Sequence, residues 1–312
     1  MAPAEPQGNQ NESTLSDELK FRTVAEAVID AVILADTSGK IISWNPGAEA
    51  IFGHTEAEVL GQPLTILMPE RHQAAHLRGL ERVSQTGERQ RIGRTSEVSG
   101  LRKDGQEFPI ELSLGTWVTS EGRFFCGIIR DVTERTVLQE ALRHAALHDP
   151  LTHLPNRTLC EEELRRAAAQ AVRTDRCTGV LVVDLDDFKM VNDSFGHLVG
   201  DTMLKSAGER LRSAVREGDI IARLGGDEFV VLLENLLSEM DALVVAERMV
   251  ASAEEPLTVD DHTIRITASV GVATRRGRFA PEDILRAADT ALYVAKKEGK
   301  ARFAVAPAYE SG

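Results

Sequence analysis

Apolar residues in the first 130 positions come in short runs, which predicts a small domain of strands and brief helices. The runs 31–35 and 41–44 lie on either side of a Ser38-Gly39 turn, so we expect a hairpin. Residues 69–87 place apolar side chains at helical spacing and end at a glycine, which predicts a helix. Three strand-like runs follow, at 90–102, 107–118 and 123–130. Five strands with helices between the second and third predict an α+β domain over residues 20–131.

Residues 132–148 change to the pattern of a charged helix. Leu138, Ala141, Leu142 and Ala145 fall on one side of such a helix. The stripe covers about two heptads, whereas about three to four are needed before a coiled coil is convincingly indicated. The pattern therefore leaves two alternatives open, a plain linker helix and a short coiled coil.

From residue 149 to residue 306, helix-like and strand-like segments alternate. The apolar strand 179–184 ends in an acidic residue, and two strands, 220–224 and 229–233, flank a Gly-Gly-Asp-Glu turn. The remaining elements are expected as helices over 156–173, 199–216, 236–253 and 281–298 and a strand over 263–273. This order predicts an α/β domain with a βαββαβ core and additional elements.

Charge narrows the classes of partner. The 312 residues include 36 basic and 49 acidic side chains, for a net charge of −13. A phosphate backbone attracts the opposite sign, so we expect no nucleic-acid partner. A nucleotide substrate stays compatible, because a few local cations and a bound metal can hold phosphates in an acidic protein. The length indicates two domains of roughly 100–200 residues each.

The sequence has no recognisable targeting or anchoring signal. Residues 1–19 are polar, which predicts a disordered tail and not a signal peptide, and residues 307–312 are expected to form a second tail. No apolar run approaches the ~20 residues that span a bilayer. Cys126, Cys160 and Cys177 follow no metal-binding or disulfide pattern. We therefore expect a cytoplasmic protein with no membrane partner.

Two groups of acidic residues are expected to meet at one end of the second sheet. One group follows the 179–184 strand and the other lies in the tight turn: Asp184, Asp186 and Asp187, then Asp227 and Glu228. The glycines at 225–226 permit positive φ and leave room for a ligand. Carboxylates are hard ligands that suit Mg²⁺ (or Mn²⁺) and leave positions for phosphates, and such an ion activates an attacking hydroxyl. A solvated acidic hairpin is the alternative interpretation of the turn taken alone.

Further motifs follow one another in a fixed order through residues 148–303. They are Asp149-Pro150-Leu151-Thr152, Asp184 to Lys189, Asn192-Asp193, Phe195-Gly196-His197, Gly200-Asp201, Leu224 to Phe229, Ser269 to Ala273, and Ala288-Asp289 through Tyr293 to Lys296. In this order they resemble the GGDEF family of diguanylate cyclases. The resemblance implies a palm-like βαββαβ core around a central, mostly antiparallel sheet, and a domain over residues 149–306.

The resemblance also implies a metal site. Asp184 and Asp227 would hold Mg²⁺ through their carboxylates, with the Leu185 carbonyl assisting and Glu228 as a further ligand. The implied catalytic residues are Asp227, Glu228 and Lys189, and the lysine would offset negative charge on the phosphate in the transition state.

A guanine nucleotide is the implied substrate. Asn192 and Asp201 match the guanine-recognising positions, because a carboxylate accepts from N1–H and the exocyclic amine while an amide bonds the base edge. Other substrate contacts are expected from Phe188, His197, Gly226, Lys296 and Lys300. A structural and a catalytic role are both open for His197. Lys300 stands where the family usually has arginine, so bidentate phosphate contact is lost and weaker triphosphate binding is expected.

The implied reaction condenses two GTP molecules into cyclic di-GMP and two pyrophosphates. Each domain presents one GTP, and the 3′-hydroxyl of one attacks the α-phosphate of the other, so two chains must meet as a homodimer. Arg216 and Asp219 form the Arg-x-x-Asp pattern of the family's product-inhibition site, which Arg248 of a neighbouring domain would complete. An exposed ion pair at a helix end is the alternative for Arg216 and Asp219.

Residues 20–131 carry a second set of motifs. They are Ile41 to Asn45, Phe52-Gly53, Glu58-Val59-Leu60-Gly61, Arg102 to Gly105, and the closing Arg130 to Arg135. This set resembles PAS sensor domains, in which Asp131-Val132-Thr133 corresponds to the exit motif that passes a signal into the following helix. The resemblance does not identify a ligand.

His76 is the candidate haem ligand of this domain. It lies six residues after Glu70, a spacing similar to that of the proximal histidine in haem-binding PAS domains. A helix-surface histidine is the favoured alternative, and a metal shared with His72 lacks a visible third ligand. Trp44 raises flavin as a further alternative. A domain without a cofactor is therefore the first expectation, haem the second and flavin the third.

The combined prediction is a PAS–helix–cyclase signalling protein in which the 132–148 helix sets whether two cyclase domains meet. One rival is a domain that only binds cyclic di-GMP, and a second is a cyclase for another nucleotide. The intact Asp184 and Asp227 argue against the first rival, and Asn192 with Asp201 favours guanine over other bases.

Overall fold

The chain was analysed as a computed structural model that describes residues 23–86, 95–119, 122–174, 176–259 and 262–307. It divides into two compact units, Met1–Glu140 and Ala141–Gly312. The expected tail 1–19, residues 90–94 of the expected strand 90–102, and residues 308–312 of the second tail lie outside the described residues. No helix within the described ranges is both long and apolar enough to cross a membrane.

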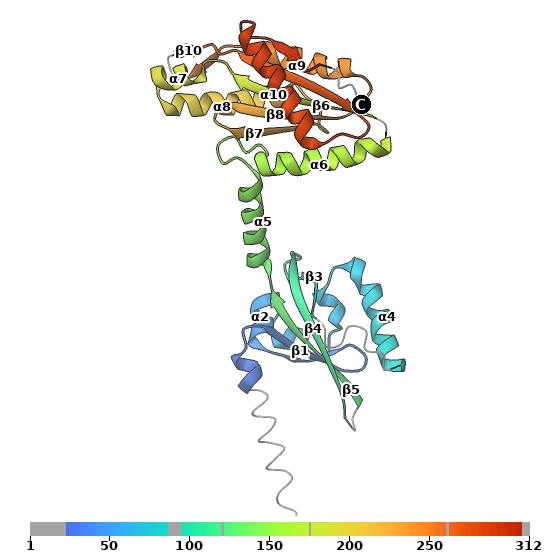
Figure 1. Cartoon of the computed structure of the whole chain (residues 1–312). Helices are drawn as coiled ribbons and strands as arrows, with labels where there is room; N and C mark the ends of the chain where they lie inside the picture. The colour runs from blue at the N-terminus through green and yellow to red at the C-terminus, as the bar shows by residue number, and fades with distance from the viewer. Residues whose placement is uncertain (1–22, 87–94, 120–121, 175, 260–261, 308–312) are drawn as a thin grey trace, which may run out of the picture. The chain divides into compact units, whose positions relative to one another are not determined.

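The first unit is built on a five-stranded antiparallel sheet in the order β2-β1-β5-β4-β3. Its strands are β1 (Ala31–Ala35), β2 (Ile41–Trp44), β3 (Thr95–Leu101), β4 (Glu107–Thr119) and β5 (Gly122–Asp131). Between β2 and β3 lie α2 (Pro46–Phe52), α3 (Glu56–Val59), the 3₁₀ helix η1 (Leu64–Leu67) and α4 (Glu70–Thr86) (Figure 1). The predicted α+β class is confirmed.

Local chemistry sets the path from β2 into α2. The Asn45 side chain accepts from the backbone N–H groups of Ala48 and Val32 and donates to the Asp30 carbonyl, so it caps α2 and fixes the preceding loop. Gly53 ends the helix with φ 78°. These contacts bring Phe52 into the core, where it is fully buried.

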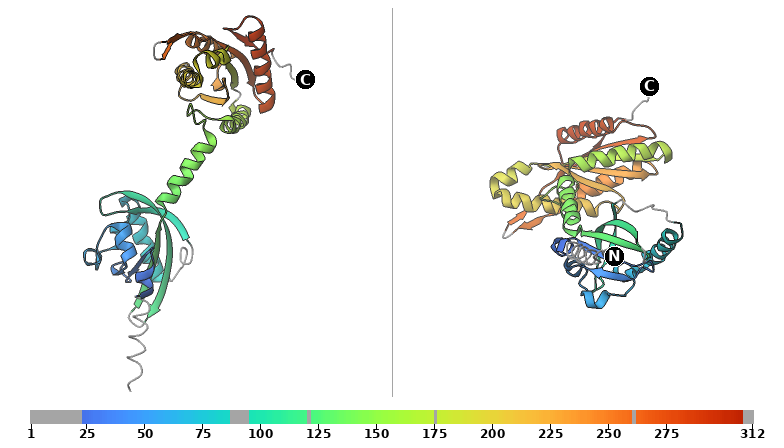
Figure 2. Two further views of the ribbon diagram at one scale, coloured as in Figure 1. Left: turned by 90° about the vertical axis from the view of Figure 1, so that its left-hand side faces the viewer. Right: turned by 90° about the horizontal axis from the view of Figure 1, so that it is seen from below.

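The helix α5 (Thr133–Leu147) follows β5 and is continuous (Figure 2). Asp131 caps it by accepting from the Thr133 N–H at 2.8 Å, and the same carboxylate pairs with Arg102 at 2.5 Å. No residue of α5 is buried, and Leu138 and Leu142 are 55% and 70% exposed. The helix thus begins firmly on the first unit and presents an uncovered apolar stripe.

The second unit has a sheet in the order β12-β11-β6-β8-β7, antiparallel except for the β11–β12 pair. The strands are β6 (Cys177–Leu185), β7 (Ile220–Gly225), β8 (Glu228–Leu236), β11 (Ala268–Arg276) and β12 (Phe303–Val305). The helices are α6 (Arg157–Thr174), α7 (Phe188–Phe195), α8 (His197–Ser213), α9 (Glu239–Ala253) and α10 (Pro281–Lys297), and β9 (Leu257–Val259) pairs with β10 (His262–Ile264). The expected mostly antiparallel sheet is confirmed.

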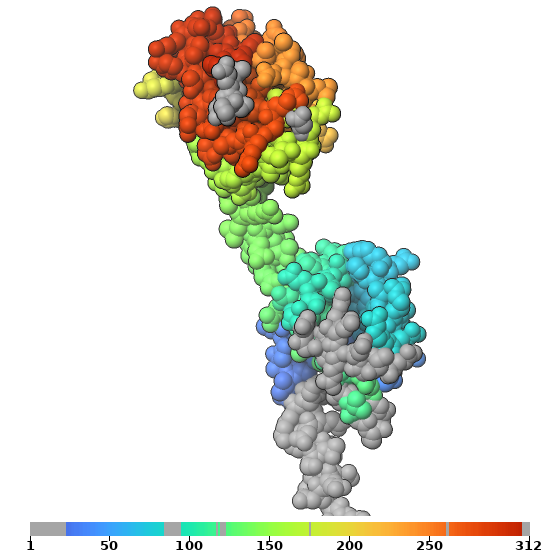
Figure 3. Space-filling view, turned by 45° about the vertical axis from the view of Figure 1, so that its right-hand side comes forward, coloured from blue at the N-terminus to red at the C-terminus, as the bar shows by residue number. Residues whose placement is uncertain are grey.

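Helices cover both faces of this sheet, which explains why all nine residues of β6 are buried. Leu181 and Val183 face the core shared with α8 and α9, and Val180 and Val182 face α6 and α10. Gly271 lets α10 approach β11 closely, because a Cβ there would overlap the helix backbone. The outer side of α10 forms part of the unit's surface (Figure 3).

One expected strand needs correction, and three elements of this unit were missed. The single strand expected over 263–273 is wrong, because residues 265–267 separate β10 from β11. Thr267 is held away from the ladder by Asp186, whose N–H donates to the Thr267 carbonyl and whose carboxylate accepts from the Thr267 hydroxyl. The helix α7 and the strands β9 and β12 were not expected as elements.

Candidate active site

The acidic groups on β6 and β8 lie side by side. Asp184 stands directly opposite Glu228 in the antiparallel register, and the Leu185 N–H approaches the Asp227 carbonyl at 3.4 Å. Gly226 and Asp227 form the turn between β7 and β8, and Gly225 and Gly226 adopt positive φ of 141° and 55° there. The sheet therefore gathers carboxylates that are more than forty positions apart in the chain.

Asp184 is the buried member of the group, at 8% exposure. Burial raises its pKa, and the nearby carboxylates of Asp227 and Asp186 act in the same direction. Lys296 of α10 opposes this shift, because its Nζ lies 2.8 Å from the Asp184 carboxylate. A buried carboxylate with acidic neighbours favours the approach of a further cation.

The donor set fits Mg²⁺ or Mn²⁺. Asp184, Asp227 and Glu228 offer carboxylate oxygens, and Leu185 offers a carbonyl, all of which are hard ligands. Within the described ranges, no three His, Cys, Asp or Glu side chains are placed so that they could hold a metal ion by themselves. The protein would thus supply part of a coordination shell, and phosphate and water oxygens the remainder.

Asp186, although adjacent in sequence, has a different environment. Its carboxylate accepts from the hydroxyls of Thr267 and Ser269 at 2.7 Å each and from the Ala301 N–H at 3.1 Å. These contacts satisfy a buried carboxylate and connect the end of β6 to the loop after α10. Asp186 therefore stabilises the fold beside the acidic group.

Lysines from α10 and from the loop after it pair with the acidic residues. Lys300, in the loop after α10, places its Nζ 2.7 Å from the Asp187 carboxylate, and this contact raises the lysine pKa. Lys189 is exposed on α7, one residue after the buried Phe188. Lys296 and Lys300 thus contact carboxylates that the sequence singled out, and Lys189 lies on the helix that follows Asp187.

The residues expected to recognise guanine lie where α7 meets α8. Asn192 is on α7, and Asp201 is on α8 next to Gly200. A Cβ at Gly200 would overlap the Asn192 side-chain oxygen and lie 3.3 Å from the Phe188 ring. Gly200 therefore permits the close helix packing that positions Asn192, while His197 is exposed in the first turn of α8.

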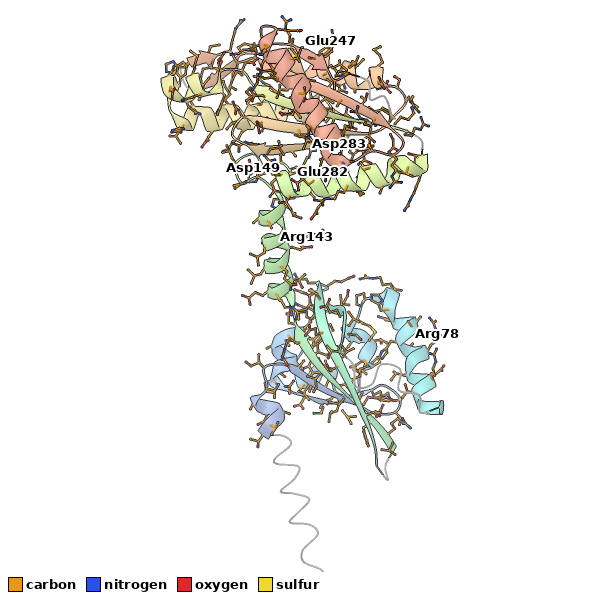
Figure 4. All side chains as sticks on the ribbon, in the orientation of Figure 1. Arg78, Arg143, Asp149, Glu247, Glu282 and Asp283 are labelled. Carbon is orange, nitrogen blue, oxygen red and sulfur yellow. The ribbon has the colours of Figure 1, made fainter. Side chains whose placement is uncertain are left out.

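The sequence did not predict that an arginine, Arg223, holds the tight turn through hydrogen bonds and an ion pair. Arg223 of β7 donates to the Gly226 carbonyl through Nε at 3.0 Å and Nη2 at 2.7 Å, and its Nη1 pairs with Asp149 at 2.8 Å. Burial raises the pKa of Asp149, but hydrogen bonds from Thr152 and Arg223 outweigh it and lower the pKa overall. Asp149, labelled in Figure 4, comes two residues after the end of α5, so Arg223 links that point to the turn.

Away from the acidic group, a hollow of about 370 Å³ lies beside α9. Its lining includes Arg216, Asp219 and Arg248. The Arg216 Nε lies 3.2 Å from the Asp219 carboxylate, whose side chain is only 3% exposed. Arg248 was expected from a neighbouring domain, but this chain's own Arg248 lines the same hollow as Arg216.

In the first unit, His76 lies on the side of α4 that faces a cavity against the sheet. Its Nε2 is buried without a hydrogen-bond partner in the described part of the chain, and burial lowers its pKa. Arg78, two positions on, points away from the sheet (Figure 4). His76 therefore faces the cavity and is not the helix-surface histidine that the sequence favoured.

Comparison with known proteins agrees with this geometry. Residues 146–302, half of the chain, match the family described as diguanylate cyclase, GGDEF domain. The chain belongs to the GGDEF family. Residues 19–132 match the PAS fold, so the second unit is a GGDEF domain and the first a PAS domain.

Curated relatives match over part of their length. The bifunctional diguanylate cyclase/cyclic di-GMP phosphodiesterase MucR of Pseudomonas aeruginosa is 46% identical over 156 residues, which are 50% of this chain and 23% of the relative. The probable diguanylate cyclase DgcE of Escherichia coli is 30% identical over 301 residues, which are 95% of this chain and 27% of the relative. The chain thus spans about a quarter of the length of these relatives.

Solved structures match the GGDEF domain. The GGDEF domain of TpbB (YfiN) from Pseudomonas aeruginosa has 40% identity and a TM-score of 0.50, covering 51% of this chain and 94% of that one. The coiled coil and GGDEF domain of DgcB from Caulobacter crescentus, solved in complex with c-di-GMP, has 28% identity and a TM-score of 0.53, covering 56% and 93%.

Proposed function

We propose that this chain is a diguanylate cyclase that condenses two GTP molecules into cyclic di-GMP and two pyrophosphates. The observation that supports the proposal most strongly is that Asp184 and Glu228 lie opposite each other on β6 and β8, beside Asp227. The Lys296 Nζ contacts the Asp184 carboxylate at the same place. This arrangement joins the ligands of a divalent cation to a phosphate-binding charge at one end of the sheet.

Each residue has a place in the proposed reaction. Asp184, Asp227 and the Leu185 carbonyl would hold Mg²⁺, with Glu228 as a further ligand, and Lys189, Lys296 and Lys300 would contact phosphates. Such an ion polarises the α-phosphate and favours ionisation of the attacking hydroxyl. The 3′-hydroxyl of one GTP loses its proton to water, and its oxygen forms a bond to the α-phosphorus of the other. The bond from that phosphorus to the oxygen bridging to the β-phosphate breaks, and pyrophosphate leaves with the electron pair. The same transfer in the opposite direction closes the ring.

The proposal is tested by incubating the full chain with Mg²⁺ and GTP and identifying the products by mass. We expect cyclic di-GMP, and none when EDTA removes the metal. If the chain binds cyclic di-GMP but forms none, the binding-only alternative is correct. If ATP is cyclised as readily as GTP, the assignment of guanine to Asn192 and Asp201 is wrong.

Substituting Gly200→Ala is expected to raise the KM for GTP. The new methyl group would displace the Asn192 side chain, and loss of one hydrogen bond to the base corresponds to about tenfold in affinity. Steady-state kinetics at saturating Mg²⁺ measures the effect. Thr202→Ala, an exposed change on the same helix, is the matched control. An unchanged KM in Gly200→Ala would remove Asn192 from the substrate site.

Product feedback at the hollow beside α9 is part of the proposal. Arg216 and Arg248 supply cationic donors, and Asp219 supplies an acceptor for a guanine edge. The Arg216–Asp219 ion pair also supports the alternative of a structural contact, so Arg248, which is exposed, gives the cleaner test.

Arg248→Ala is expected to weaken inhibition by cyclic di-GMP by about ten- to a hundredfold, the worth of a charge-assisted hydrogen bond. Initial turnover before product accumulates should stay near the wild-type rate. The inhibition curve with added product is the measurement, and Glu247→Ala, the exposed neighbour labelled in Figure 4, is the control. Equal inhibition in wild type and Arg248→Ala would exclude Arg248 from the product site.

We also propose that the PAS domain regulates the cyclase through α5 in a homodimer. Arg135, in the first turn of α5, pairs with Glu111 at 2.6 Å and with Glu97 at 3.0 Å. These contacts, with the Asp131 cap, tie the start of the helix to β3 and β4 of the PAS sheet. A rearrangement of the sheet would therefore bias the helix and the encounter of two GGDEF domains.

A further inference from the structure

The PAS domain has a partly open cavity of about 480 Å³ between its helical segment and the inner face of the sheet. Ile110, Leu112 and Phe125 contribute to the sheet side, and Leu67, Ala75 and His76 to the helical side. This volume lies within the range of about 300–1,000 Å³ that small-molecule sites occupy. The lining is mostly apolar, so the cavity suits a molecule with little polar surface.

Gly127 lines the cavity on the sheet side, and its lack of a side chain leaves volume there. It lies on β5 between Phe125 and Ile129, which face the same side of the sheet and also line the cavity. A Cβ at Gly127 would meet only one atom within 4 Å, the Leu112 Cδ1 at 3.6 Å, which is ordinary contact. Neighbouring protein atoms therefore do not require glycine, although glycine weakens a strand interior. Its effect is to leave space above the strand.

His76 places one polar atom in this apolar surrounding. The Nε2 atom is buried and has no hydrogen-bond partner in the described part of the chain. Burial lowers the pKa of His76, so the imidazole is neutral near pH 7 and Nε2 can pair with a single polar group. Buried polar atoms in folded proteins are generally hydrogen-bonded, which points to a partner that enters the cavity.

The charges around the cavity restrict that partner. Among its described lining residues, Glu97 is the only Asp, Glu, Lys or Arg, and it already pairs with Arg135. The basic side chains of the described lining are His72 and His76, and no lysine or arginine there could pair with a carboxylate or phosphate on a ligand. This disfavours haem with its two propionates and flavin nucleotides with their phosphates.

We propose that the cavity binds an uncharged, mostly apolar small molecule whose single hydroxyl group, or an equivalent polar group, hydrogen-bonds to His76 Nε2. The ligand occupies the space above Gly127 and contacts β3, where Glu97 connects the cavity to Arg135 of α5. This site gives the PAS domain a ligand class that is independent of the cyclase chemistry.

The test uses the full chain without GTP, so its outcome is separate from that of the cyclase proposal. The uncharged dye 1-aminoanthracene reports on the cavity by fluorescence, and 2-naphthol and naphthalene compete with it as a matched pair. We expect one saturable site per chain and a preference for 2-naphthol of about tenfold, the worth of one hydrogen bond. His76→Leu should remove the preference but retain naphthalene binding, and His76→Gln should restore part of it.

Substitutions on β5 test separately whether the ligand occupies the space above Gly127. Gly127→Phe should abolish displacement by both compounds, whereas Ile128→Phe, on the opposite and exposed face of the strand, should bind like wild type. Gly127→Leu gives a smaller filling should the phenylalanine variant unfold, and thermal unfolding identifies folded variants. Unchanged binding in a folded Gly127 variant, a preference that persists in His76→Leu, or a Soret band in the purified chain would each overturn the proposal.

Discussion

Asp184→Asn is expected to lower cyclic di-GMP turnover by about a thousandfold, the scale on which single groups that stabilise transition-state charge contribute. The substitution removes a carboxylate from the proposed Mg²⁺ ligands and leaves Lys296 without its 2.8 Å partner. A weaker affinity for Mg²⁺ should accompany the loss of turnover. Both are measured by initial rates over a series of metal concentrations.

Thermal stability separates this catalytic role from a structural one. The pKa of Asp184 is raised in the folded chain above that of an unfolded aspartate, mainly by burial. The folded state then holds the proton more tightly, so the ionised carboxylate opposes folding at pH values above the raised pKa. At pH 7 without metal, Asp184→Asn should therefore unfold at the same temperature as wild type or higher.

The matched control is Asp283→Asn, which removes the same charge at an exposed position in the first turn of α10, labelled in Figure 4. It should retain wild-type turnover. A drop of several degrees in the unfolding temperature of Asp184→Asn would mean that the carboxylate supports the fold, and normal turnover in that variant would exclude it from the metal site.

The double substitution Leu138→Ser with Leu142→Ser is expected to abolish dimerisation at micromolar concentrations and to lower turnover per chain more than tenfold. Both side chains are mostly exposed on α5, and burying a leucine contributes about 1.5–3 kcal/mol. In the proposed reaction each GGDEF domain presents one GTP and two domains must meet, so turnover should fall. Analytical ultracentrifugation and the rate as a function of protein concentration measure the two effects.

The control for α5 keeps the helical spacing but changes residues outside the apolar stripe. Gln139→Ser with Arg143→Ser introduces the same side chain twice at positions four apart. Arg143 is labelled on α5 in Figure 4. Dimerisation and turnover should remain as in wild type. If the leucine variant remains a fully active dimer, α5 is not the contact that brings the GGDEF domains together.

The sequence was sufficient where an element carries its own periodicity. The strands β1 and β2 and the helix α5 were predicted to within about one residue, and the apolar run of β6 correctly indicated a buried strand. The adjacency of Asp184 and the Asp227-Glu228 turn also followed from strand order, because antiparallel neighbours bring the end of one strand to the start of the next.

Features that depend on distant partners could not be predicted. The helix α7 has only eight residues and lacks a side-chain cap, so little in the pattern distinguishes it from a loop. The break between β10 and β11 depends on Asp186, about 80 positions earlier. The Arg223–Asp149 pair likewise joins residues 74 positions apart. In these cases tertiary contacts decide the local conformation.

The PAS cavity illustrates a different limit. In the sequence, Gly127 is only a weak strand residue, and His76 was singled out only through its resemblance to the proximal histidine of haem-binding PAS domains, so neither defined the lining of the cavity. Their significance appears when β5 and α4 are placed on opposite sides of the same space. The hollow beside α9 is similar, since Arg248 and Arg216 come from a helix and a loop whose proximity depends on packing.

The most direct test of the central claim is to measure cyclic di-GMP and pyrophosphate in the same reaction of the full chain with GTP and Mg²⁺. A diguanylate cyclase must release two pyrophosphates for each cyclic dinucleotide, and Asp227→Asn should stop both products together. Release of pyrophosphate without cyclic di-GMP, or binding of cyclic di-GMP by a chain that forms neither product, would contradict the account.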